Sequence, residues 1–330
     1  MFKNKVILIT GGTGSWGYEL VNQLLDEYPK EIRIFSRNEN NQVEMKRAFQ
    51  FDPRLRFIIG DIKDERAVSQ SFIDVDYVFH LAALKHVTVC EEQPYEALKT
   101  NIIGTENVIH AAIENKVKKV IYISTDKAAN PTNFYGFTKS IGEKLAIHAN
   151  LLSSHTKFVC IRAGNVLGSN GSVIHIFKKQ IKDKEKITIT HHDMTRFFLT
   201  LEDAISLLFK AARESQGGEV FVMKMPSCRI KDLAIVLGKA YGKDKNIEFE
   251  ELGVRPGEKL HEILFSEHES LNTVVYDSNY YVILPSIEIN GLKDCYRDCR
   301  PVELKSYVSS DHLMTHDEIQ QMLEKGKFIS

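Results

Sequence analysis

Two short segments carry side chains suited to acid–base chemistry. Tyr135 and Lys139 lie four residues apart, so on a helix they share one face. An ammonium near a phenol favours the phenolate and lowers the tyrosine pKa. Tyr135 is therefore a candidate base for removing a hydroxyl proton. The segment Ser124-Thr-Asp-Lys127 ends eight residues before Tyr135 and adds a carboxyl and an amine.

A glycine-rich turn near the N-terminus indicates a nucleotide site. Residues 10–17 read Thr-Gly-Gly-Thr-Gly-Ser-Trp-Gly, directly after Val-Ile-Leu-Ile and before a helical pattern. Gly11, Gly14 and Gly17 allow a sharp turn and a close approach to a pyrophosphate, whose charge the helix N-terminus favours. Because strand, motif and helix follow in the required order, we predict a dinucleotide site. The dinucleotide would accept hydride while Tyr135 takes the proton.

The end of the second predicted strand favours NADP over NAD. Ser36 and Arg37 stand about 20 residues beyond the glycines, where an NAD-binding fold usually carries Asp or Glu. A hydroxyl beside a guanidinium suits a 2′-phosphate, because arginine forms bidentate, charge-assisted bonds to phosphate. NAD remains the alternative if Arg37 is an ordinary exposed loop residue.

Alternating strands and helices must position these groups. Continuous apolar strands with amphipathic segments between them indicate a parallel sheet covered on both faces, the Rossmann-type doubly wound α/β fold. The predicted strands are Lys5–Thr10, Glu31–Ser36, Arg56–Gly60, Asp76–Leu81, Lys118–Ser124 and Lys157–Ala163. The predicted helices include Tyr18–Tyr28, Tyr95–Asn115 and Tyr135–Asn150.

The pattern loosens after about residue 164, which indicates a second, smaller and discontinuous α/β lobe. We expect residues 1–164 plus about 197–224 to form the dinucleotide domain, and about 165–196 plus 225–330 to form the substrate lobe. In such folds the ligand lies in the cleft above the carboxyl ends of the strands. The elements predicted here are a loop at 168–172, the strands Lys186–Thr190, Glu219–Lys224 (as the last strand of the main sheet) and Asn246–Glu251, and the helices Leu201–Glu214, Arg229–Tyr241 and Thr315–Lys325.

Composition disfavours several classes of protein. The 330 residues are 43% apolar and carry a net charge of −1, so the basic field typical of nucleic-acid binders is missing. No apolar run approaches the ~18 residues that span a bilayer, and the first strand begins near Met1, so we expect neither a membrane partner nor a signal peptide. Five scattered cysteines fit reduced thiols in a cytoplasmic protein, with a redox pair of Cys295 and Cys299 as the alternative.

A third segment is predicted to end at the same cleft, His80-Leu-Ala-Ala-Leu-Lys-His86. Its small residues Ala82 and Ala83 would let the backbone run close to a cofactor. Lys85 and His86 would then point into the cleft. The alternative for His86 is a structural or surface histidine.

These motifs resemble the extended short-chain dehydrogenase/reductase superfamily. More closely, the chain is similar to the soluble UDP-N-acetylglucosamine 4,6-dehydratases, including the C5-inverting branch that begins pseudaminic acid synthesis. The resemblance covers nearly the whole chain. Its specific blocks are Leu84-Lys-His86, Lys99-Thr-Asn101, Ser124-Thr-Asp-Lys-Ala-Ala-Asn-Pro131, Gly164-Asn-Val166, Met194-Thr-Arg-Phe197 and Arg255-Pro-Gly-Glu-Lys-Leu-His-Glu262.

The resemblance implies a role for each acid–base group. Tyr135, supported by Lys139, would deprotonate the sugar 4-hydroxyl while hydride passes from C4 to the cofactor and later returns to C6. Lys127 would remove the C5 proton, and protonated Asp126, next to Thr125, would donate to the departing C6 hydroxyl. At neutral pH an unperturbed lysine is a poor base and an unperturbed aspartate a poor acid. A dry cleft is expected to lower the lysine pKa and to raise the aspartate pKa. The alternative is a simple loop ion pair.

The resemblance also implies the ligand contacts for UDP-N-acetylglucosamine. Arg196 and Arg255 would bind the diphosphate, since planar guanidinium pairs with phosphate oxygens. Glu258 would bind a uridine ribose hydroxyl, Asn165 the substrate between the lobes, and Asp61 the adenine amino group. The full substrate set is Lys85, His86, Asn165, Val173, Arg196, Arg255 and Glu258. The full cofactor set is Gly11, Thr13, Gly14, Ser15, Trp16, Gly17, Ser36, Arg37, Asp61, Ile62, Leu81, Ala82, Ala83, Lys85, Asn101, Ser124, Tyr135 and Lys139.

Several residues depart from the family pattern on the substrate side. They are Thr88, Ala163, Asn170, His175 and the run His191-His-Asp193. Because they leave the acid–base groups intact, they put in doubt only the outcome at C5: inversion, retention, or release of a 5,6-unsaturated sugar. We interpret His191 and His192 as a polar turn and expect no metal site.

Other functions stay open at this point. A nucleotide-sugar 4-epimerase or reductase would not need Asp126 and Lys127, and a non-catalytic NADP-binding module would need neither these nor Tyr135. The resemblance further implies a homo-oligomer, either a dimer or a hexamer, and a place in nonulosonic acid (pseudaminic acid) or surface glycan synthesis.

Overall fold

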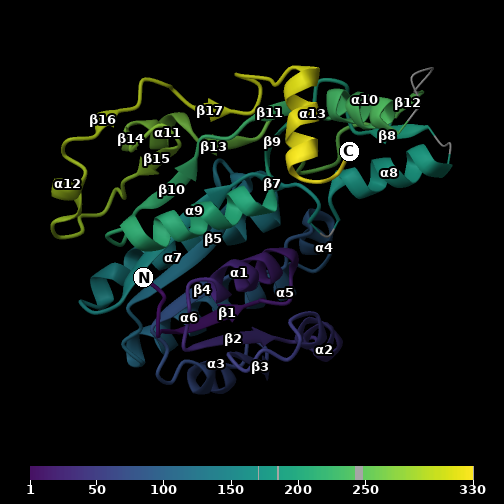
Figure 1. The fold of residues 1–330 in the computed structure, drawn as a ribbon. Helices are drawn as coiled ribbons and strands as arrows, with labels where there is room; N and C mark the ends of the chain where they lie inside the picture. The colour runs from purple at the N-terminus through teal and green to yellow at the C-terminus, as the bar shows by residue number, and fades with distance from the viewer. Residues whose placement is uncertain (170, 184–185, 242–247, 330) are drawn as a thin grey trace.

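The computed structural model describes residues 1–169, 171–183, 186–241 and 248–329, and ten strands of these residues form one central sheet (Figure 1). The strand order is β16-β14-β15-β10-β6-β5-β4-β1-β2-β3. In this order, the strands from β10 across to β3 pair in parallel, as predicted. Strands β15, β14 and β16 extend the sheet beyond β10 and pair antiparallel. Their bounds are β1 Val6–Thr10, β2 Glu31–Ser36, β3 Leu55–Ile59, β4 Tyr77–His80, β5 Lys119–Thr125, β6 Lys157–Ala163, β10 Val220–Met223, β14 Thr273–Val275, β15 Tyr280–Ile283 and β16 Arg300–Pro301.

Strand β10 lies inside the sheet, so its prediction as the last strand is wrong. Val220 pairs with Cys160 of β6 on one side and with Ile283 of β15 on the other. The added strands have two to four residues each, too short for an alternation pattern to reveal them. They cover an edge that would otherwise leave backbone N–H and C=O groups unpaired.

Helices cover both faces of the sheet. On one face α1 packs against α9, and on the other α6 lies between α3 and α7 (Figure 1). The bounds of these and the neighbouring helices are α1 Ser15–Leu25, α2 Glu39–Ala48, α3 Glu65–Ser71, α4 Val87–Glu92, α5 Pro94–Leu98, α6 Gly104–Glu114, α7 Phe134–Leu152 and α9 Leu201–Glu214.

The helix predicted over Tyr95–Asn115 is divided in the structure. Residues Lys99–Ile103 form a π-helical turn between α5 and α6. Such turns insert an extra residue and often adjoin functional sites. Here the turn carries Asn101, whose amide holds Leu84 by bonds of 2.8 and 2.9 Å to its backbone N–H and C=O.

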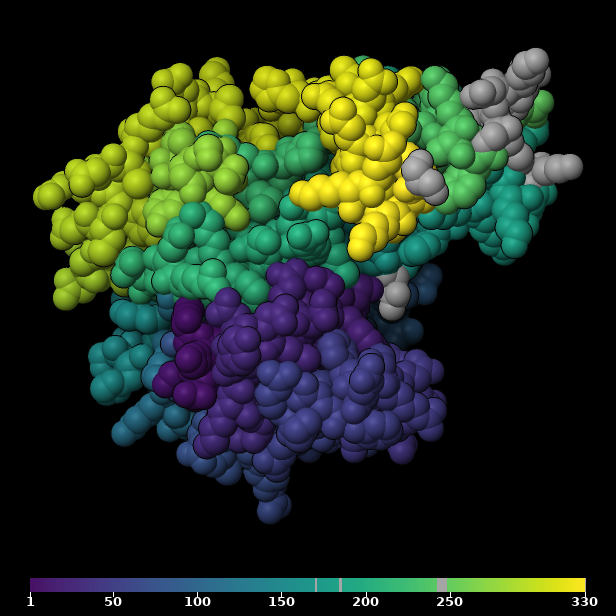
Figure 2. All heavy atoms as spheres, in the orientation of Figure 1, coloured from purple at the N-terminus to yellow at the C-terminus, as the bar shows by residue number. Residues whose placement is uncertain are grey.

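A second apolar cluster lies beyond the carboxyl ends of the parallel strands. It includes Phe177, Leu237 and Leu323, which are fully or almost fully buried. In Figure 2 its teal, green and yellow segments lie above the purple N-terminal half. The elements that build it are α8 Val173–Asp183, β8 Ile187–Ile189, β9 Thr195–Leu199, β11 Ser227–Arg229, α10 Ile230–Ala240, β12 Phe249–Glu251 and α13 His316–Lys325. Strand β7 Asn165–Val166 pairs with β9, and its Val166 belongs to the first cluster.

The remaining short elements are β13 Ile263–Phe265, α11 Glu267–Ser270, α12 Leu292–Cys295 and β17 Tyr307–Val308. The predicted strand Asn246–Glu251 begins outside the described residues. Asn170, one of the residues that depart from the family pattern, also lies outside them. The division of the chain into two lobes stays a prediction.

Candidate active site

A cavity of about 860 Å³ opens at the carboxyl ends of the parallel strands, where the two apolar clusters meet. Almost all residues predicted for the site line it. The two that do not are Asn101, which is engaged with Leu84, and Asp126, which is fully buried. The predicted residues along its wall are Gly11, Thr13, Gly14, Ser15, Trp16, Gly17, Ser36, Arg37, Asp61, Ile62, Leu81, Ala82, Ala83, Lys85, His86, Ser124, Thr125, Lys127, Tyr135, Lys139, Asn165, Val173, Arg196, Arg255 and Glu258.

The glycine turn forms one end of the cavity and fits a pyrophosphate. Gly11 has a φ of +69°, and an added Cβ would lie 2.8 Å from the Ala82 backbone. Only glycine therefore allows this close approach. Helix α1 begins at Ser15, directly after the turn, so the N–H groups of its first turn face this end.

The end of β2 carries the groups predicted for a 2′-phosphate. Arg37 is 55% exposed and lies 3.8 Å from Asp61, so it is loosely held and free to bind an anion. The Ser36 hydroxyl accepts a 2.9 Å hydrogen bond from Gln42, which also bonds the Ile58 carbonyl. Gln42 thus positions Ser36, a role that the sequence pattern did not reveal.

Tyr135 lies at the start of α7, held by the cap of this helix. The Asn133 side chain accepts from the Gly136 N–H at 2.8 Å and donates to the Gly257 carbonyl at 2.8 Å. Burial raises the pKa of Tyr135 to about 12, although Lys127 and a hydrogen bond with Thr125 act to lower it. The prediction that an ammonium gives Tyr135 a lowered pKa is therefore wrong, because burial outweighs it.

Lys139 lies one helical turn further along α7. Its Nζ stands 4.0 Å from the centre of the Tyr122 ring. Burial lowers the pKa of Lys139 to about 8, so the amine titrates near neutral pH.

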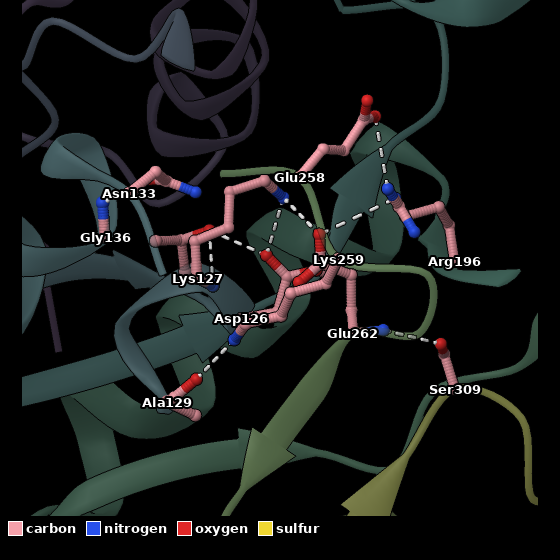
Figure 3. A network of polar contacts seen from close by, with 12 residues as sticks. Asp126, Lys127, Ala129, Asn133, Gly136, Arg196, Glu258, Lys259, Glu262 and Ser309 are labelled. Carbon is pink, nitrogen blue, oxygen red and sulfur yellow. Dashed lines mark hydrogen bonds and ion pairs between the residues drawn. The ribbon is translucent and has the colours of Figure 1, made fainter. Parts of the chain in front are cut away.

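Lys127 is the centre of a buried ionic cluster (Figure 3). Its Nζ lies 3.0 Å from Asp126 Oδ1 and 3.2 Å from Glu262 Oε1. The Thr125 hydroxyl donates to the same Asp126 oxygen at 2.8 Å. Asp126 and Glu262 are 0% and 1% exposed, and the second carboxyl oxygen of each lacks a hydrogen-bond partner among the described residues.

The cluster changes the pKa values of the proposed acid and base in different ways. Burial and the negative charge of Glu262 raise the pKa of Asp126, although Lys127 opposes them, and this agrees with the prediction. Burial acts to lower the pKa of Lys127, but the two carboxylates outweigh it and raise this pKa above its ordinary value. The predicted lowering of the Lys127 pKa is therefore wrong, because Glu262 is a second anionic neighbour.

Arg196 joins the cluster to the substrate side of the cavity. Its Nε lies 3.6 Å from Glu262, and its Nη2 lies 3.3 Å from Glu258. Bonds from Nη1 to the carbonyls of Thr195 and Leu260 fix the guanidinium, which is 5% exposed. Burial acts to raise the pKa of Glu262, but Lys127 and Arg196 outweigh it and lower this pKa.

The segment 255–262, which carries Arg255, Glu258 and Glu262, is hydrogen-bonded to the segment that follows Lys127. Lys259 Nζ donates to the Ala129 carbonyl at 2.7 Å, and the Glu262 N–H donates to the Ser309 hydroxyl at 2.9 Å (Figure 3). Glu262 is the main residue of the site that sequence reasoning missed. It ends the block Arg255–Glu262 quoted above, so the signal was present without a role attached to it.

The parallel sheet and the cleft at the carboxyl ends of its strands define a class of protein. It is a Rossmann-type α/β protein of the extended short-chain dehydrogenase/reductase kind. The model of the family described as polysaccharide biosynthesis protein matches residues 7–284, and the chain belongs to this family.

Relatives with curated descriptions support the resemblance stated above. UDP-N-acetylglucosamine 4,6-dehydratase (inverting) from Campylobacter jejuni is 46% identical over 292 residues, which cover 87% of this chain and 85% of that protein. An uncharacterized membrane protein of Methanocaldococcus jannaschii is 47% identical over 278 residues, or 82% of this chain and 83% of the relative. A UDP-glucose 4-epimerase of Rickettsia canadensis is 42% identical over 299 residues, which cover 89% of this chain and 87% of that protein.

A solved structure shares the whole fold. The X-ray structure of Pen from Bacillus thuringiensis has a TM-score of 0.90 and 40% identity, covering 98% of this chain and 99% of that one. Each helix within the described ranges is too short or too polar to cross a bilayer.

Proposed function

We propose that the protein is an NADP-dependent UDP-N-acetylglucosamine 4,6-dehydratase that inverts C5. The observation that carries the proposal is the buried cluster of Asp126, Lys127 and Glu262 beside Tyr135. A 4-epimerase needs a base at the 4-hydroxyl, which Tyr135 alone supplies. Elimination across C5 and C6 needs a second base and an acid close together, and the cluster supplies both. The Campylobacter relatives with this description add support.

The cofactor end of the cavity fits NADP. The glycine turn and the α1 N-terminus would hold the pyrophosphate, Ser36 and Arg37 the 2′-phosphate, and Asp61 the adenine. Tyr135 and Lys139 would lie at the nicotinamide ribose. When bound, NADP supplies the hydride acceptor for C4 and the hydride donor for C6.

The opposite end fits a uridine diphosphate sugar. Arg196 and Arg255 would bind the diphosphate and Glu258 the uridine ribose, while Asn165 and Val173 contact the sugar between the lobes. Lys85 and His86 would contact the sugar from the segment that follows β4. Because Arg196 is held by two carboxylates, the diphosphate would compete with Glu258 and Glu262 for it.

One internal proton transfer prepares both the base and the acid. Lys127 passes a proton to Asp126 across their 3.0 Å contact, which gives a neutral amine and a neutral carboxylic acid. The amine takes the C5 proton, and the acid protonates the departing C6 hydroxyl. A C5–C6 double bond forms, water leaves, and the original ion pair is restored. When hydride returns to C6, C5 would take a solvent-derived proton, which completes the 4-keto-6-deoxy sugar.

The Thr125 hydroxyl connects Asp126 to the sugar. Asp126 does not reach the cavity wall, whereas Thr125 lines it and donates to Asp126 Oδ1. Once Lys127 has protonated Asp126, the Thr125 hydroxyl turns to accept from the carboxylic acid. A proton then passes from Asp126 to the Thr125 oxygen while Thr125 releases its own proton to the C6 hydroxyl. Tyr135, assisted by Lys139, takes the 4-hydroxyl proton at the start of the cycle.

The product identifies the reaction. We expect carbon NMR of UDP-N-acetylglucosamine incubated with the protein and NADP⁺ to show a C4 ketone and a C6 methyl group. The Tyr135→Phe variant is the matched control and should leave the substrate unchanged. A product that differs only in C4 configuration would contradict the proposal and support the epimerase, the description of the Rickettsia relatives. C5 configuration in the same spectrum distinguishes inversion from retention, and olefinic C5 and C6 signals in place of the methyl group would identify a released 5,6-ene.

An apolar surface supports a homo-oligomer, with a dimer as its smallest unit. Helices α5 and α7 pack together and expose Tyr95, Leu98, Phe137 and Ile141, which are 78%, 37%, 49% and 45% exposed. A second copy would cover this face. Sedimentation velocity should show a dimer or hexamer, and Phe137→Glu with Ile141→Lys should reduce it to a monomer.

The setting of the enzyme follows from its substrate. We place it in the cytoplasm, where a nucleotide sugar is available, at the start of pseudaminic acid or another surface glycan. We also propose two lobes, residues 1–164 plus about 197–224 for NADP and about 165–196 plus 225–330 for the nucleotide sugar.

A further inference from the structure

Tyr122 touches Lys139 at both ends of the lysine. The ammonium lies 4.0 Å from the centre of the Tyr122 ring, well within the ~6 Å range of a cation–π contact. The Tyr122 hydroxyl lies 3.4 Å from the Lys139 carbonyl and donates to it. Tyr122 is 1% exposed and lies on β5, behind the cavity wall, so it holds Lys139 from the side opposite the ligands.

The Tyr122 ring occupies a space that exists only because residue 142 is glycine. An added Cβ at Gly142 would overlap the Tyr122 hydroxyl. The ring also packs against the His80 ring at 5.7 Å between centres. Burial lowers the pKa of His80 to about 3, so its ring is neutral and does not compete for the Tyr122 face as a cation.

No carboxylate described here forms a salt bridge with Lys139. Glu143, one turn further along α7, is bound by Arg162 at 2.6 and 2.8 Å. Cys160 of β6 is a buried thiol whose pKa is raised by burial, so it carries no charge at neutral pH. Tyr135 on the same helix is a neutral phenol until it acts. Glu143 still acts through its charge to raise the pKa of Lys139. The ring face of Tyr122 is the group that contacts the ammonium directly.

We propose that Tyr122 is a positioning residue that holds the Lys139 side chain as a cation facing the cofactor. The catalytic consequence rests on the proposed function, because it assumes that Lys139 assists Tyr135 at the nicotinamide ribose. The contact itself does not. Without the ring, the buried amine loses the group that stabilises its charge, becomes neutral at lower pH, and loses its fixed direction.

The contact is tested by measuring how the reactivity of Lys139 depends on pH. The full chain is labelled with trace acetic anhydride, which reacts with neutral amines, and the peptide that contains Lys139 is quantified by mass spectrometry. We expect a labelling midpoint near pH 8 in the natural protein and in Tyr122→Phe, which keeps the ring. In Tyr122→Leu the midpoint should fall by roughly one pH unit, the shift that a desolvated cation–π contact gives. Equal midpoints in the natural protein and Tyr122→Leu would overturn the proposal.

A double variant separates positioning from packing. Gly142→Ala alone displaces the ring, so it should lower both the midpoint and the melting temperature. Tyr122→Leu with Gly142→Ala removes the overlap and should regain melting temperature while the midpoint stays low. If the midpoint recovers together with the melting temperature, Tyr122 acts only in packing and the proposal is wrong.

Activity distinguishes this inference from the proposed function. If both hold, C4 oxidation in Tyr122→Leu keeps its acid-side rate and falls from neutral pH upwards, where its Lys139 has become neutral, in step with the labelling shift. Tyr122→Phe should retain the natural profile. A labelling shift in a protein that never reduces NADP⁺ with UDP-N-acetylglucosamine would contradict the proposed function and leave the Tyr122–Lys139 contact established.

Discussion

Glu262 Oε1 lies 3.2 Å from Lys127 Nζ, and the same oxygen lies 3.6 Å from Arg196 Nε. One buried carboxylate thus joins the proposed C5 base to the proposed diphosphate ligand. Asp126 and Lys127 alone would form an isolated ion pair. With Glu262 they form a cluster that also contacts Arg196, so a diphosphate bound to Arg196 would act on the cluster through Glu262.

The substitution Glu262→Gln should move the alkaline limb of C5–H exchange to lower pH. Glu262 raises the Lys127 pKa, so its loss lets Lys127 give up its proton to solvent at lower pH. We expect a shift of roughly 1 to 3 pH units, the size that a nearby opposite charge causes. The measurement is solvent deuterium exchange at C5 of UDP-N-acetylglucosamine as a function of pH.

Glu258→Gln is the matched control for this variant. It also removes a carboxylate from Arg196, but none from Lys127. Its KM for the substrate should change while the alkaline limb stays in place. If both variants move the limb equally, the coupling between Glu262 and Lys127 is not specific.

The substitution Lys127→Ala should separate the two halves of the reaction. Tyr135 and Lys139 remain, so C4 oxidation continues and reduced cofactor accumulates. Elimination stops because the C5 base is missing. The near-ultraviolet absorbance of the reduced cofactor follows the first step, and product NMR follows the second. Normal turnover by this variant would show that Lys127 is not the base.

The substitution Arg37→Ala should remove the preference for NADPH over NADH. A charge-assisted hydrogen bond contributes roughly 1.5–3 kcal/mol, so NADPH affinity should fall about tenfold or more while NADH affinity is unchanged. Trp16 is the single tryptophan and lines the cavity, so energy transfer from Trp16 to the reduced nicotinamide reports binding. An equal loss for both cofactors would place Arg37 outside the 2′-phosphate site.

The substitution Arg162→Met should destabilise the fold. The guanidinium lies 2.6 Å from Glu143 and 2.7 Å from Glu269, and all three groups are buried or largely buried. Removing it leaves two unpaired carboxylates, which costs roughly 3–5 kcal/mol of the free energy of unfolding. Urea unfolding at neutral pH measures this loss.

The pH dependence and a surface control check the cause of that loss. Arg162 lowers the pKa of Glu269 against the effect of burial, so this stabilisation is present above the ordinary glutamate pKa. It is lost as the pH falls below about 4, and the two proteins should converge there. The exposed pair Arg213–Glu27, also 2.6 Å, should cost about 0–1 kcal/mol in Arg213→Met. Similar losses of unfolding free energy in Arg162→Met and Arg213→Met would show that burial of the Arg162 cluster does not cause the destabilisation.

The parallel half of the fold was predictable because its signals are local. Strands such as Val6–Thr10 and Lys119–Thr125 are continuous apolar runs, and the glycine turn between a strand and a helix is a short motif. The antiparallel strands were not predictable, because Thr273–Val275 and Arg300–Pro301 are short and owe their conformation to pairing with β15 and with β14, respectively.

The site was predictable in its residues but not in its electrostatics. Tyr135, Lys139 and Lys127 were identified from spacing and resemblance, and they line one cavity. The pKa shifts of Tyr135 and Lys127 were predicted in the wrong direction, because they depend on burial and on Glu262, which lies far away in sequence. Tyr122 was read as a strand residue, since only the fold brings its ring to Lys139.

Deuterium incorporation at C5 shows whether Lys127 removes the C5 proton. UDP-N-acetylglucosamine is incubated with the protein and NADP⁺ in deuterated water, and C5 of the product is followed by NMR. Our account predicts one solvent deuterium at C5 of a 4-keto-6-deoxy sugar, with the C4 hydrogen recovered at C6. A product without deuterium at C5 would contradict it, because Lys127 would then never have removed that proton.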